Sequence, residues 1–260
     1  MSESYWRRPR LGEAILEALG ATGANAPAPS IDDLARFDHF HGGGIAATRR
    51  LARAAEPAPG SRVLDIGGGL GGPARLLAVE HGCDVTVLDL TEDYVRAGQM
   101  LTALLHLEDR VRLRQGDALD LPFPDGTFDL VWTQNSGMNI ADKERLYRGI
   151  QRVLRPGGRL ATQEPVAGPV QPPHFPLMWA RDAAGSFLLT AGALRALIQA
   201  SGFSDRVWEE VTSPPPQTAA VEPNIQTLAM GDRLPAIQAS NTRNWAERRL
   251  ASITGVFTRE

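Results

Sequence analysis

A glycine-rich loop is the first stretch of the chain whose residue types could do chemistry. Five of the six residues from Gly67 to Gly72 are glycine, and the loop stands between the apolar run 63–66 and a helical pattern. A strand that turns into a helix in this way leaves backbone N–H groups and the helix dipole open to a ligand. Because glycine has no Cβ, a sugar or phosphate can approach the backbone closely. We therefore expect a cofactor at this loop.

Acidic residues stand at the ends of the predicted strands beside the loop. Asp65 lies at the end of the first strand, where the ammonium of an amino-acid moiety would need a carboxylate. Asp89 ends the second strand, and a carboxylate there can accept hydrogen bonds from both hydroxyls of a ribose. Asp117 follows the third strand, within reach of an adenine amino group. These positions favour a cofactor that contains a nucleoside.

The glycine pattern by itself fits two cofactor classes. Gly67, Gly69 and Gly72 satisfy the dinucleotide pattern G-x-G-x-x-G, and the same stretch read from Asp65 through Gly71 satisfies D-x-G-x-G-x-G. A tight turn that binds nothing is a third interpretation. A nicotinamide enzyme would also need a second βαβ half and a residue at the hydride site, and we find neither in the sequence.

Alternating strand and helix patterns would bring these residues to one edge of a sheet. The alternation implies right-handed crossovers, helices on both faces and a doubly wound, Rossmann-like α/β fold. A strong stop at Arg155 to Gly158 ends the helix before the fifth strand. The expected strands are 62–66, 84–90, 110–117, 127–135, 159–165, 206–211 and 252–259, and the main helices are 72–82, 91–107, 142–154, 190–201 and 238–250.

The remaining segments predict a cap and two lids. Residues 1–60 alternate helical pieces with loops and predict an N-terminal helical cap, with Ser30 or Asp32 capping one helix, and residues 61–260 form the main domain. Five prolines between Pro165 and Pro176 predict a stiff, irregular connection. We expect lid insertions at about 165–190 and 213–240.

Composition excludes several classes of protein. The chain has 260 residues, 43% of them hydrophobic, a net charge of −3 and one cysteine, Cys83. A disulfide framework is excluded, and neither a metal site nor a nucleic-acid-binding surface is expected. No apolar stretch approaches the roughly 20 residues that span a bilayer, and the N-terminus lacks the apolar stretch of a signal peptide. We expect a cytoplasmic monomer or homodimer with no membrane partner.

With these motifs in order, residues 60 to 165 resemble the class I S-adenosylmethionine-dependent methyltransferases. The stretches 39–78, 132–140 and 152–164 are similar to the small-molecule branch, which includes sarcosine and dimethylglycine methyltransferases and the sterol and ubiquinone C-methyltransferases. Many relatives have cysteine where this chain has Gly68, and a small residue suffices there. The resemblance implies a seven-stranded sheet with an antiparallel last strand, supplied by 252–259.

The resemblance also implies roles for single residues. In that family the acid matching Asp89 binds the ribose, the one matching Asp117 meets the adenine, and the glycine loop faces the methionine part of S-adenosylmethionine. The expected cofactor-binding residues are Asp65, Gly67, Gly69, Asp89, Leu90, Gly116, Asp117, Ala118 and Gln134.

Residues of the acceptor site should come from segments near the carboxyl ends of the strands. His41, His39 and His174 are the candidate bases, each with a capping or packing role as the alternative. Asn135, Phe175 and Trp179 are the candidate substrate contacts, and Gln134 could contact either cofactor or substrate.

The expected function is methyl transfer to a small-molecule metabolite, with N- or O-methylation before C-methylation. Alignment of acceptor, methyl and sulfur can contribute roughly 7–11 kcal/mol. A general base is needed only where the acceptor must lose a proton early. The alternatives are a protein of this fold that binds the cofactor or catalyses a rearrangement, and a nicotinamide oxidoreductase.

Overall fold

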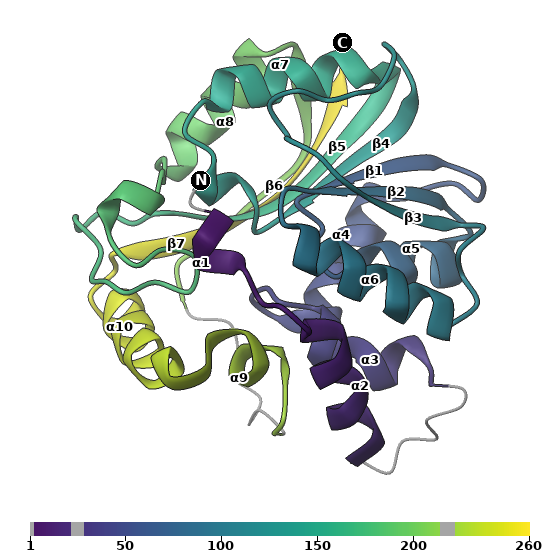
Figure 1. The fold of residues 1–260 in the computed structure, drawn as a ribbon. Coiled ribbons are helices and arrows are strands. Elements are labelled where there is room, and N and C mark those ends of the chain that lie inside the picture. The colour runs from purple at the N-terminus through teal and green to yellow at the C-terminus, as the bar shows by residue number, and fades with distance from the viewer. Residues whose placement is uncertain (1–2, 22–28, 214–221) are drawn as a thin grey trace.

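The computed structural model describes residues 3–21, 29–213 and 222–260. A seven-stranded sheet runs through the middle of the molecule in the order β3-β2-β1-β4-β5-β7-β6 (Figure 1). Strands β1 to β5 are parallel, and β7 is antiparallel to both β5 and β6. This confirms the expected doubly wound sheet and its antiparallel last strand. The strands are β1 (Arg62–Ile66), β2 (Asp84–Asp89), β3 (Val111–Gln115), β4 (Phe128–Gln134), β5 (Leu154–Ala167), β6 (Phe203–Val211) and β7 (Leu250–Arg259).

Helices cover both faces of the sheet. Helices α7 (Lys143–Val153) and α8 (Ala191–Ala200) lie on one face, and α4 (Gly44–Ala55), α5 (Gly72–His81) and α6 (Glu92–Leu104) lie on the other (Figure 1). Successive residues of a strand point to opposite faces, so Leu64 packs with α7 and α8 while Val63 packs with α4 and α5. A central strand buried on both faces accounts for the continuous apolar run before the glycine loop.

Two of the N-terminal helices, α2 (Leu11–Ala21) and α3 (Ile31–Asp38), pack against α6 and α5 below the sheet (Figure 1). The short helix α1 (Glu3–Trp6) precedes them, and the Tyr5 hydroxyl donates to the carbonyl of Leu177. Ser30 caps α3, with its hydroxyl accepting from the Asp33 N–H and the Asp33 carboxylate accepting from the Ser30 N–H. Of the two expected caps, Ser30 is therefore the one that the structure uses.

Several boundaries differ from those the sequence predicts. Strand β5 begins at Leu154, and the residues expected to form a turn at Arg155 to Gly158 lie within it as an irregularity, because β4 pairs with Leu154 and then with Arg159. The helix expected at 238–250 is α10 (Leu234–Ala246), which starts with Pro235 in its first turn. Proline fits that position because its φ is already helical and no N–H is needed there.

The expected lid segments contain short elements. Residues 165–190 hold the end of β5 and the short 3₁₀ helix η2 (Ala183–Gly185). Residues 214–221 lie outside the described part of the chain, and the rest of the second segment folds as α9 (Ile225–Met230), the 3₁₀ turn η3 (Gly231–Arg233) and the start of α10. Helix α9 packs with α2 and α3 below the sheet (Figure 1). Across the described residues, each helix is too short or too polar to cross a membrane.

Candidate functional site

A cavity of about 320 Å³ opens at the carboxyl ends of β1, β2 and β4. Ligands bind at this edge of doubly wound sheets. All nine residues that the sequence analysis assigns to the cofactor line the cavity, together with His41 and Asn135. Its wall also contains residues from the N-terminal segment and from the loop after β4: Trp6, Asp38, Phe40, Ser136, Asn139, Ile140, Ala141 and Asp142.

Two glycines shape the floor of the cavity. Gly67 and Gly69 have φ of +67° and +54°, in a backbone region that residues with a side chain rarely adopt. A Cβ on Gly67 would lie 2.4 Å from Cβ of Ser136, whereas a Cβ on Gly69 would meet only Tyr94, at 3.6 Å. The missing side chain of Gly67 therefore lets two loops touch. The missing side chain of Gly69 leaves open space along the cavity floor.

Asp89 ties the glycine loop to the end of β2. One of its oxygens accepts from the Gly69 N–H at 2.9 Å and the other from the Thr91 N–H at 2.8 Å. Burial raises the pKa of the Asp89 carboxyl, and these two N–H groups lower it. Each carboxylate oxygen has a second lone pair, so Asp89 can still accept hydrogen bonds from a pair of ligand hydroxyls.

Asp65 is a buried carboxyl group in the cavity lining, and one of its oxygens has no hydrogen-bond partner among the described residues. The residue is 1% exposed, and the oxygen without a partner is Oδ2. Burial, with the charge of Asp89, raises the pKa of Asp65 to about 8. A buried acceptor left open costs free energy that a cationic ligand would recover. The site therefore fits the ammonium of an amino-acid moiety.

The far end of the cavity is formed by the start of the loop after β3. Gly116 donates its N–H to the carbonyl of Asp89 at 2.9 Å, which aligns this loop with β2. Asp117 is exposed, and its Oδ1 accepts from the Leu119 N–H at 2.9 Å. Leu90 and Ala118 line the same end. An apolar slot with a carboxylate beside it suits a flat heteroaromatic ring that carries an amino group.

Gln134 is held by a chain of hydrogen bonds at the end of β4. Its Oε1 accepts from Trp132 Nε1 and from the Thr48 hydroxyl, both at 3.2 Å, and its Nε2 donates to Gln163 at 2.9 Å. The indole N–H can only donate, which fixes the orientation of the Gln134 amide. The Thr48 hydroxyl, which donates to Gln134, also lies 3.2 Å from Nε2 of His41.

The structure separates the candidate histidines. His41 lines the cavity, and burial together with the neighbouring His39 lowers its pKa well below the usual value. His39 is 5% exposed and lies behind the wall, with Nδ1 2.6 Å from Asp38 Oδ1. Its expected role as a base is not supported, because the residue does not reach the cavity. His41 is neutral at physiological pH.

The proline-rich segment does not bring its candidates to the cavity. His174 Nε2 lies 2.7 Å from Glu247, and the His174 backbone pairs with Asn244 of α10. Phe175 and Trp179 belong to an apolar cluster with Leu177 and Leu250 rather than to the cavity wall. His174, Phe175 and Trp179 are therefore not part of the cavity wall in this structure, and their expected roles stay predictions. Pairing with α10, which is distant in sequence, turns this segment away.

One indirect link between that segment and the cavity remains. The indole N–H of Trp179 donates to the Ser186 hydroxyl at 3.0 Å, and the Trp179 carbonyl accepts from Nδ2 of Asn139, also at 3.0 Å. Asn139 lines the cavity. Trp179 can therefore influence the wall through the position of Asn139.

Three aromatic side chains at the cavity were missed by the sequence analysis. The ring of Trp6 meets those of Phe40 and Tyr94 edge to face, with centroids 6.0 and 6.2 Å apart. They come from α1, the loop after α3 and α6, so sequence spacing gives no indication of their proximity. Within the described residues, no group of three or more His, Cys, Asp or Glu side chains is arranged to hold a metal ion.

Comparison with known proteins shows that the central part of the chain is similar to methyltransferases. Residues 64–162 match a family model described as a methyltransferase domain. The chain is 37% identical over 119 residues to the glycine/sarcosine/dimethylglycine N-methyltransferase of Actinopolyspora halophila, covering 46% of this chain and 21% of that protein. It is 40% identical over 114 residues to the 27-O-demethylrifamycin SV methyltransferase of Amycolatopsis mediterranei, covering 44% and 42%. The matches span less than half of both relatives.

Solved structures extend the likeness to the whole fold. The [4+2]-cyclase SpnF superposes with a TM-score of 0.65 and 25% identity, covering 82% of this chain and 80% of that one. The geranyl diphosphate C-methyltransferase of Streptomyces coelicolor A3(2) superposes with a TM-score of 0.69 and 17% identity, covering 98% and 99%. At that identity the second match shows the fold alone.

Proposed function

Since this chain belongs to the class I S-adenosylmethionine-dependent methyltransferases that act on small molecules, we propose that it transfers a methyl group to a small-molecule acceptor, with nitrogen or oxygen favoured over carbon. The observation that carries the proposal is one cavity that unites an unpartnered buried carboxylate, a second carboxylate at the next strand end and an open glycine floor. Asp65, Asp89 and Gly69 supply these features.

The ammonium, the ribose and the adenine of S-adenosylmethionine each find a suitable group in the cavity. Asp65 lines the cavity where the ammonium would be held, and Asp89 has free lone pairs for the ribose hydroxyls. Leu90, Ala118 and Asp117 would hold the adenine between apolar contacts and a carboxylate. When bound, the cofactor supplies a methyl group already activated by the positive charge on its sulfur.

Positioning by the chain's own residues is the main contribution to catalysis in this proposal. Gln134 is fixed by Trp132, Thr48 and Gln163 and offers a rigid wall beside the glycine loop. His41 is neutral but, with a lowered pKa, is a weak proton acceptor. An amine that reacts as the free base, or a hydroxyl that loses its proton to solvent, fits such a site. The N- and O-methyltransferases among the relatives support the same acceptor classes.

The test is formation of S-adenosylhomocysteine in the presence of candidate acceptors. The full chain is incubated with S-adenosylmethionine and a panel of small amines, phenols, alcohols and acidic carbon compounds, and products are identified by mass spectrometry. We expect methylated product and S-adenosylhomocysteine in equal amounts with at least one amine or hydroxyl compound. Product formed only from carbon acceptors would overturn the N- or O- preference. Absence of S-adenosylmethionine binding would overturn the proposal itself.

A second candidate function is a rearrangement that uses the bound cofactor without consuming it. The likeness to the cyclase SpnF, at 25% identity over most of both chains, favours this candidate. Conversion of an added compound without S-adenosylhomocysteine formation would identify it. Enhanced fluorescence of a reduced nicotinamide on binding would instead indicate an oxidoreductase.

A further inference from the structure

The loop that follows β4 forms one wall of the cavity, and two buried charges hold it from behind. Asn135, Ser136 and residues 139–142 of this loop line the cavity. Asn135 has a φ of +56°, in the left-handed region that asparagine adopts more readily than other residues with a side chain. The contacts that hold the rest of the loop come from outside it.

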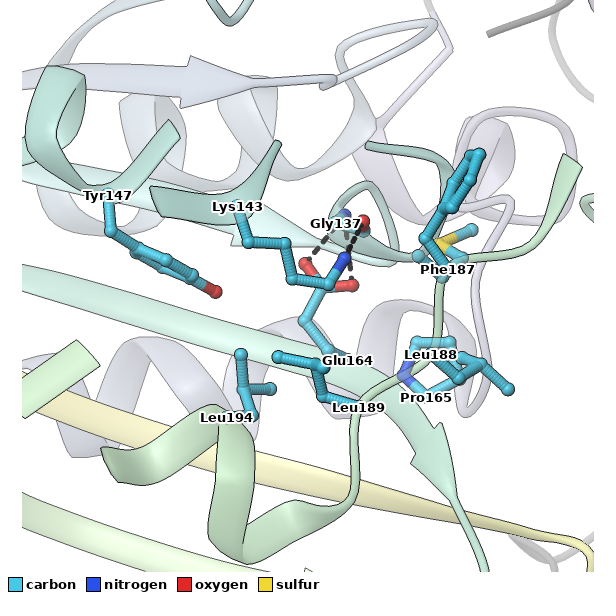
Figure 2. A pocket seen from close by; sticks show the side chains of 10 residues that line it. Gly137, Lys143, Tyr147, Glu164, Pro165, Phe187, Leu188, Leu189 and Leu194 are labelled. Carbon is cyan, nitrogen blue, oxygen red and sulfur yellow. Dashed lines mark hydrogen bonds between the residues drawn. The ribbon is translucent and has the colours of Figure 1, made fainter. Parts of the chain in front are cut away.

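Glu164 supplies the first of these contacts from the end of β5. The residue is 2% exposed, and its two carboxylate oxygens accept from the Gly137 N–H at 3.1 and 3.0 Å. The Ser136 N–H points at the same carboxylate, 3.4 Å from Oε1. Figure 2 shows the carboxylate directly beneath the Gly137 backbone. Hydrogen bonds from backbone N–H groups to a carboxylate are stronger than neutral ones.

Lys143 supplies the second contact from the first turn of α7. The residue is 9% exposed, and its Nζ donates to the carbonyl of Gly137 at 2.7 Å and to that of Ile140 at 2.9 Å. The turn between them is the 3₁₀ helix η1 (Gly137–Asn139). A negative charge thus meets N–H groups of this turn, and a positive charge meets carbonyls of Gly137 and Ile140.

The other groups that face Glu164 are neutral. The small cavity beside it has a volume of about 10 Å³, and its titratable lining residues besides Glu164 are Lys143 and Tyr147, both from α7 (Figure 2). Burial raises the pKa of Tyr147, so its hydroxyl stays protonated. The lid segment, α8 and the end of β5 contribute apolar side chains: Pro165, Phe187, Leu188, Leu189 and Leu194. Lys143 is therefore the cation in this lining that balances Glu164.

The clamped turn also touches the cofactor loop. Ser136 packs so closely on Gly67 that a Cβ on Gly67 would lie 2.4 Å from the Ser136 Cβ. Movement of the turn would therefore change both the wall formed by residues 135–142 and the floor formed by the glycine loop.

We propose that Glu164 and Lys143 are positioning residues that together clamp the 136–140 turn and so hold the wall of the cavity in the geometry that binds the cofactor and the acceptor. The effect of this clamp on catalysis rests on the proposed function, whereas the existence of the clamp does not. Neither side chain lines the large cavity, so both act through the backbone of the turn.

The ionisation of Glu164 gives this clamp a measurable signature. Burial raises the pKa of Glu164 to about 7, against the lowering effects of the Gly137 N–H and of Lys143. The ionised carboxylate accepts from the turn with both oxygens. Protonation removes the charge and converts one oxygen into a donor, so the clamp should loosen as the pH falls through about 7.

The experiment follows backbone amide exchange in residues 135–142 by mass spectrometry on the full chain, corrected for intrinsic exchange. We expect wild-type exchange to slow by about tenfold or more between about pH 6 and about pH 8, the effect of one hydrogen bond to a charged group. In Glu164→Gln the backbone amides of residues 135–142 should exchange fast at both pH values, because the glutamine side chain offers one acceptor oxygen only. Glu144→Gln, an exposed change on the same helix, should match the wild type.

Lys143→Met distinguishes a clamp from a general structural role. Removing the cation should raise the pKa of Glu164 further, so the midpoint of the exchange profile should move to higher pH. Affinity for S-adenosylhomocysteine, measured by calorimetry at about pH 8, should fall in both Glu164→Gln and Lys143→Met. The wild-type profile and the Lys143→Met shift decide the question even if Glu164→Gln does not fold.

The outcomes separate this clamp from the proposed function. Wild-type exchange that does not change with pH, or a Lys143→Met midpoint that does not move, would overturn the clamp while methyl transfer could still be observed. A pH-dependent turn in a protein that forms no S-adenosylhomocysteine would retain the clamp and contradict the proposed function.

Discussion

At the scale of single residues, the cavity contains carboxylates that differ in what surrounds them. Asp89 has a backbone N–H on each oxygen, whereas Asp65 Oδ2 has no partner among the described residues. Asp65 is therefore costly to ionise until a cation occupies the cavity. Ionisation of Asp65 therefore lowers the stability of the protein when no ligand is bound.

Asp65→Asn should stabilise the protein at high pH in the absence of cofactor. The folded pKa of Asp65 is raised to about 8, above the ordinary value of 3.8. Its contribution to stability is thus fully present below about pH 4 and is lost as the pH rises through about 8. At about pH 9 the variant should have a free energy of unfolding higher than that of the wild type by about 2 kcal/mol or more, and at about pH 4 the two should differ little.

Urea denaturation of the unliganded proteins at both pH values measures this difference. Calorimetry should show that the same variant binds S-adenosylhomocysteine more weakly. A variant less stable than the wild type at high pH would show that Asp65 is not held as an unfavourable anion.

The histidines show what a sequence can and cannot predict about single residues. His41 and His174 both stand in segments expected near the acceptor, yet His41 lines the cavity and His174 pairs with Glu247. That difference depends on where α10 packs, which no local pattern encodes. Asp65, Asp89 and Asp117 could be placed because each follows a strand whose carboxyl end is fixed by the fold.

At the scale of elements, the strand–loop–helix unit around the glycines determines the shape of the site. Gly69 has a positive φ, and its missing side chain leaves the cavity floor open. Gly157 has a φ of +71° and nothing within 4 Å of its would-be Cβ, and it lies on the surface away from the cavity. The two glycines have the same backbone requirement but different surroundings.

Gly69→Ala should weaken cofactor binding beyond its effect on stability. Both Gly69→Ala and Gly157→Ala should lower the free energy of unfolding by about 1–2 kcal/mol, the cost of left-handed backbone with a Cβ. Gly69→Ala alone should also reduce the affinity for S-adenosylhomocysteine by about tenfold or more, because the methyl group occupies the floor. Equal affinities in the two variants would show that the floor is not in contact with the ligand.

The pattern of elements was largely predictable, and their ends were less so. Short, nearly continuous apolar runs identify the central strands β1 and β4, because these strands are buried on both faces. The sequence at Arg155 to Gly158 predicts a helix stop, and the structure places these residues within β5 as an irregularity: pairing with β4 skips from Leu154 to Arg159, and pairing with β7 begins at Arg159. The clamp formed by Glu164 and Lys143 was not predictable, because it joins β5 to α7 through the backbone of a third segment.

At the scale of the whole molecule, a buried arginine joins the N-terminal helices to the elements that pack on the central sheet. Arg75 of α5 is fully buried and donates to Asp38 at the end of α3, to the carbonyl of Leu70 and to the Thr102 hydroxyl of α6. Asp38 also lies 2.6 Å from His39. The N-terminal helices are thus bound to the glycine loop by charged groups as well as by apolar packing.

Arg75→Met should destabilise the protein strongly. Removing one partner of a buried ion pair leaves the other charge uncompensated, at a cost of about 3–5 kcal/mol in the free energy of unfolding. Adding Asp38→Asn should recover part of this loss. Arg49→Met, which removes two ion pairs at the surface, with Asp32 and with Glu80, should cost less than about 1 kcal/mol. Urea denaturation measures the free energy of unfolding of each variant. Equal losses of this free energy in Arg75→Met and Arg49→Met would show that the buried Arg75–Asp38 pair contributes no more to stability than the surface ion pairs do.

Calorimetric titration of S-adenosylhomocysteine into the wild type and Asp89→Ala tests the central claim most directly. We predict saturable binding to the wild type with one site per chain. In Asp89→Ala the affinity should fall by at least about 30-fold, the loss of charged hydrogen bonds to the ribose. The exposed control Asp109→Ala should bind as the wild type does. A wild type that takes up no ligand, or an Asp89→Ala variant with unchanged affinity, would contradict the account.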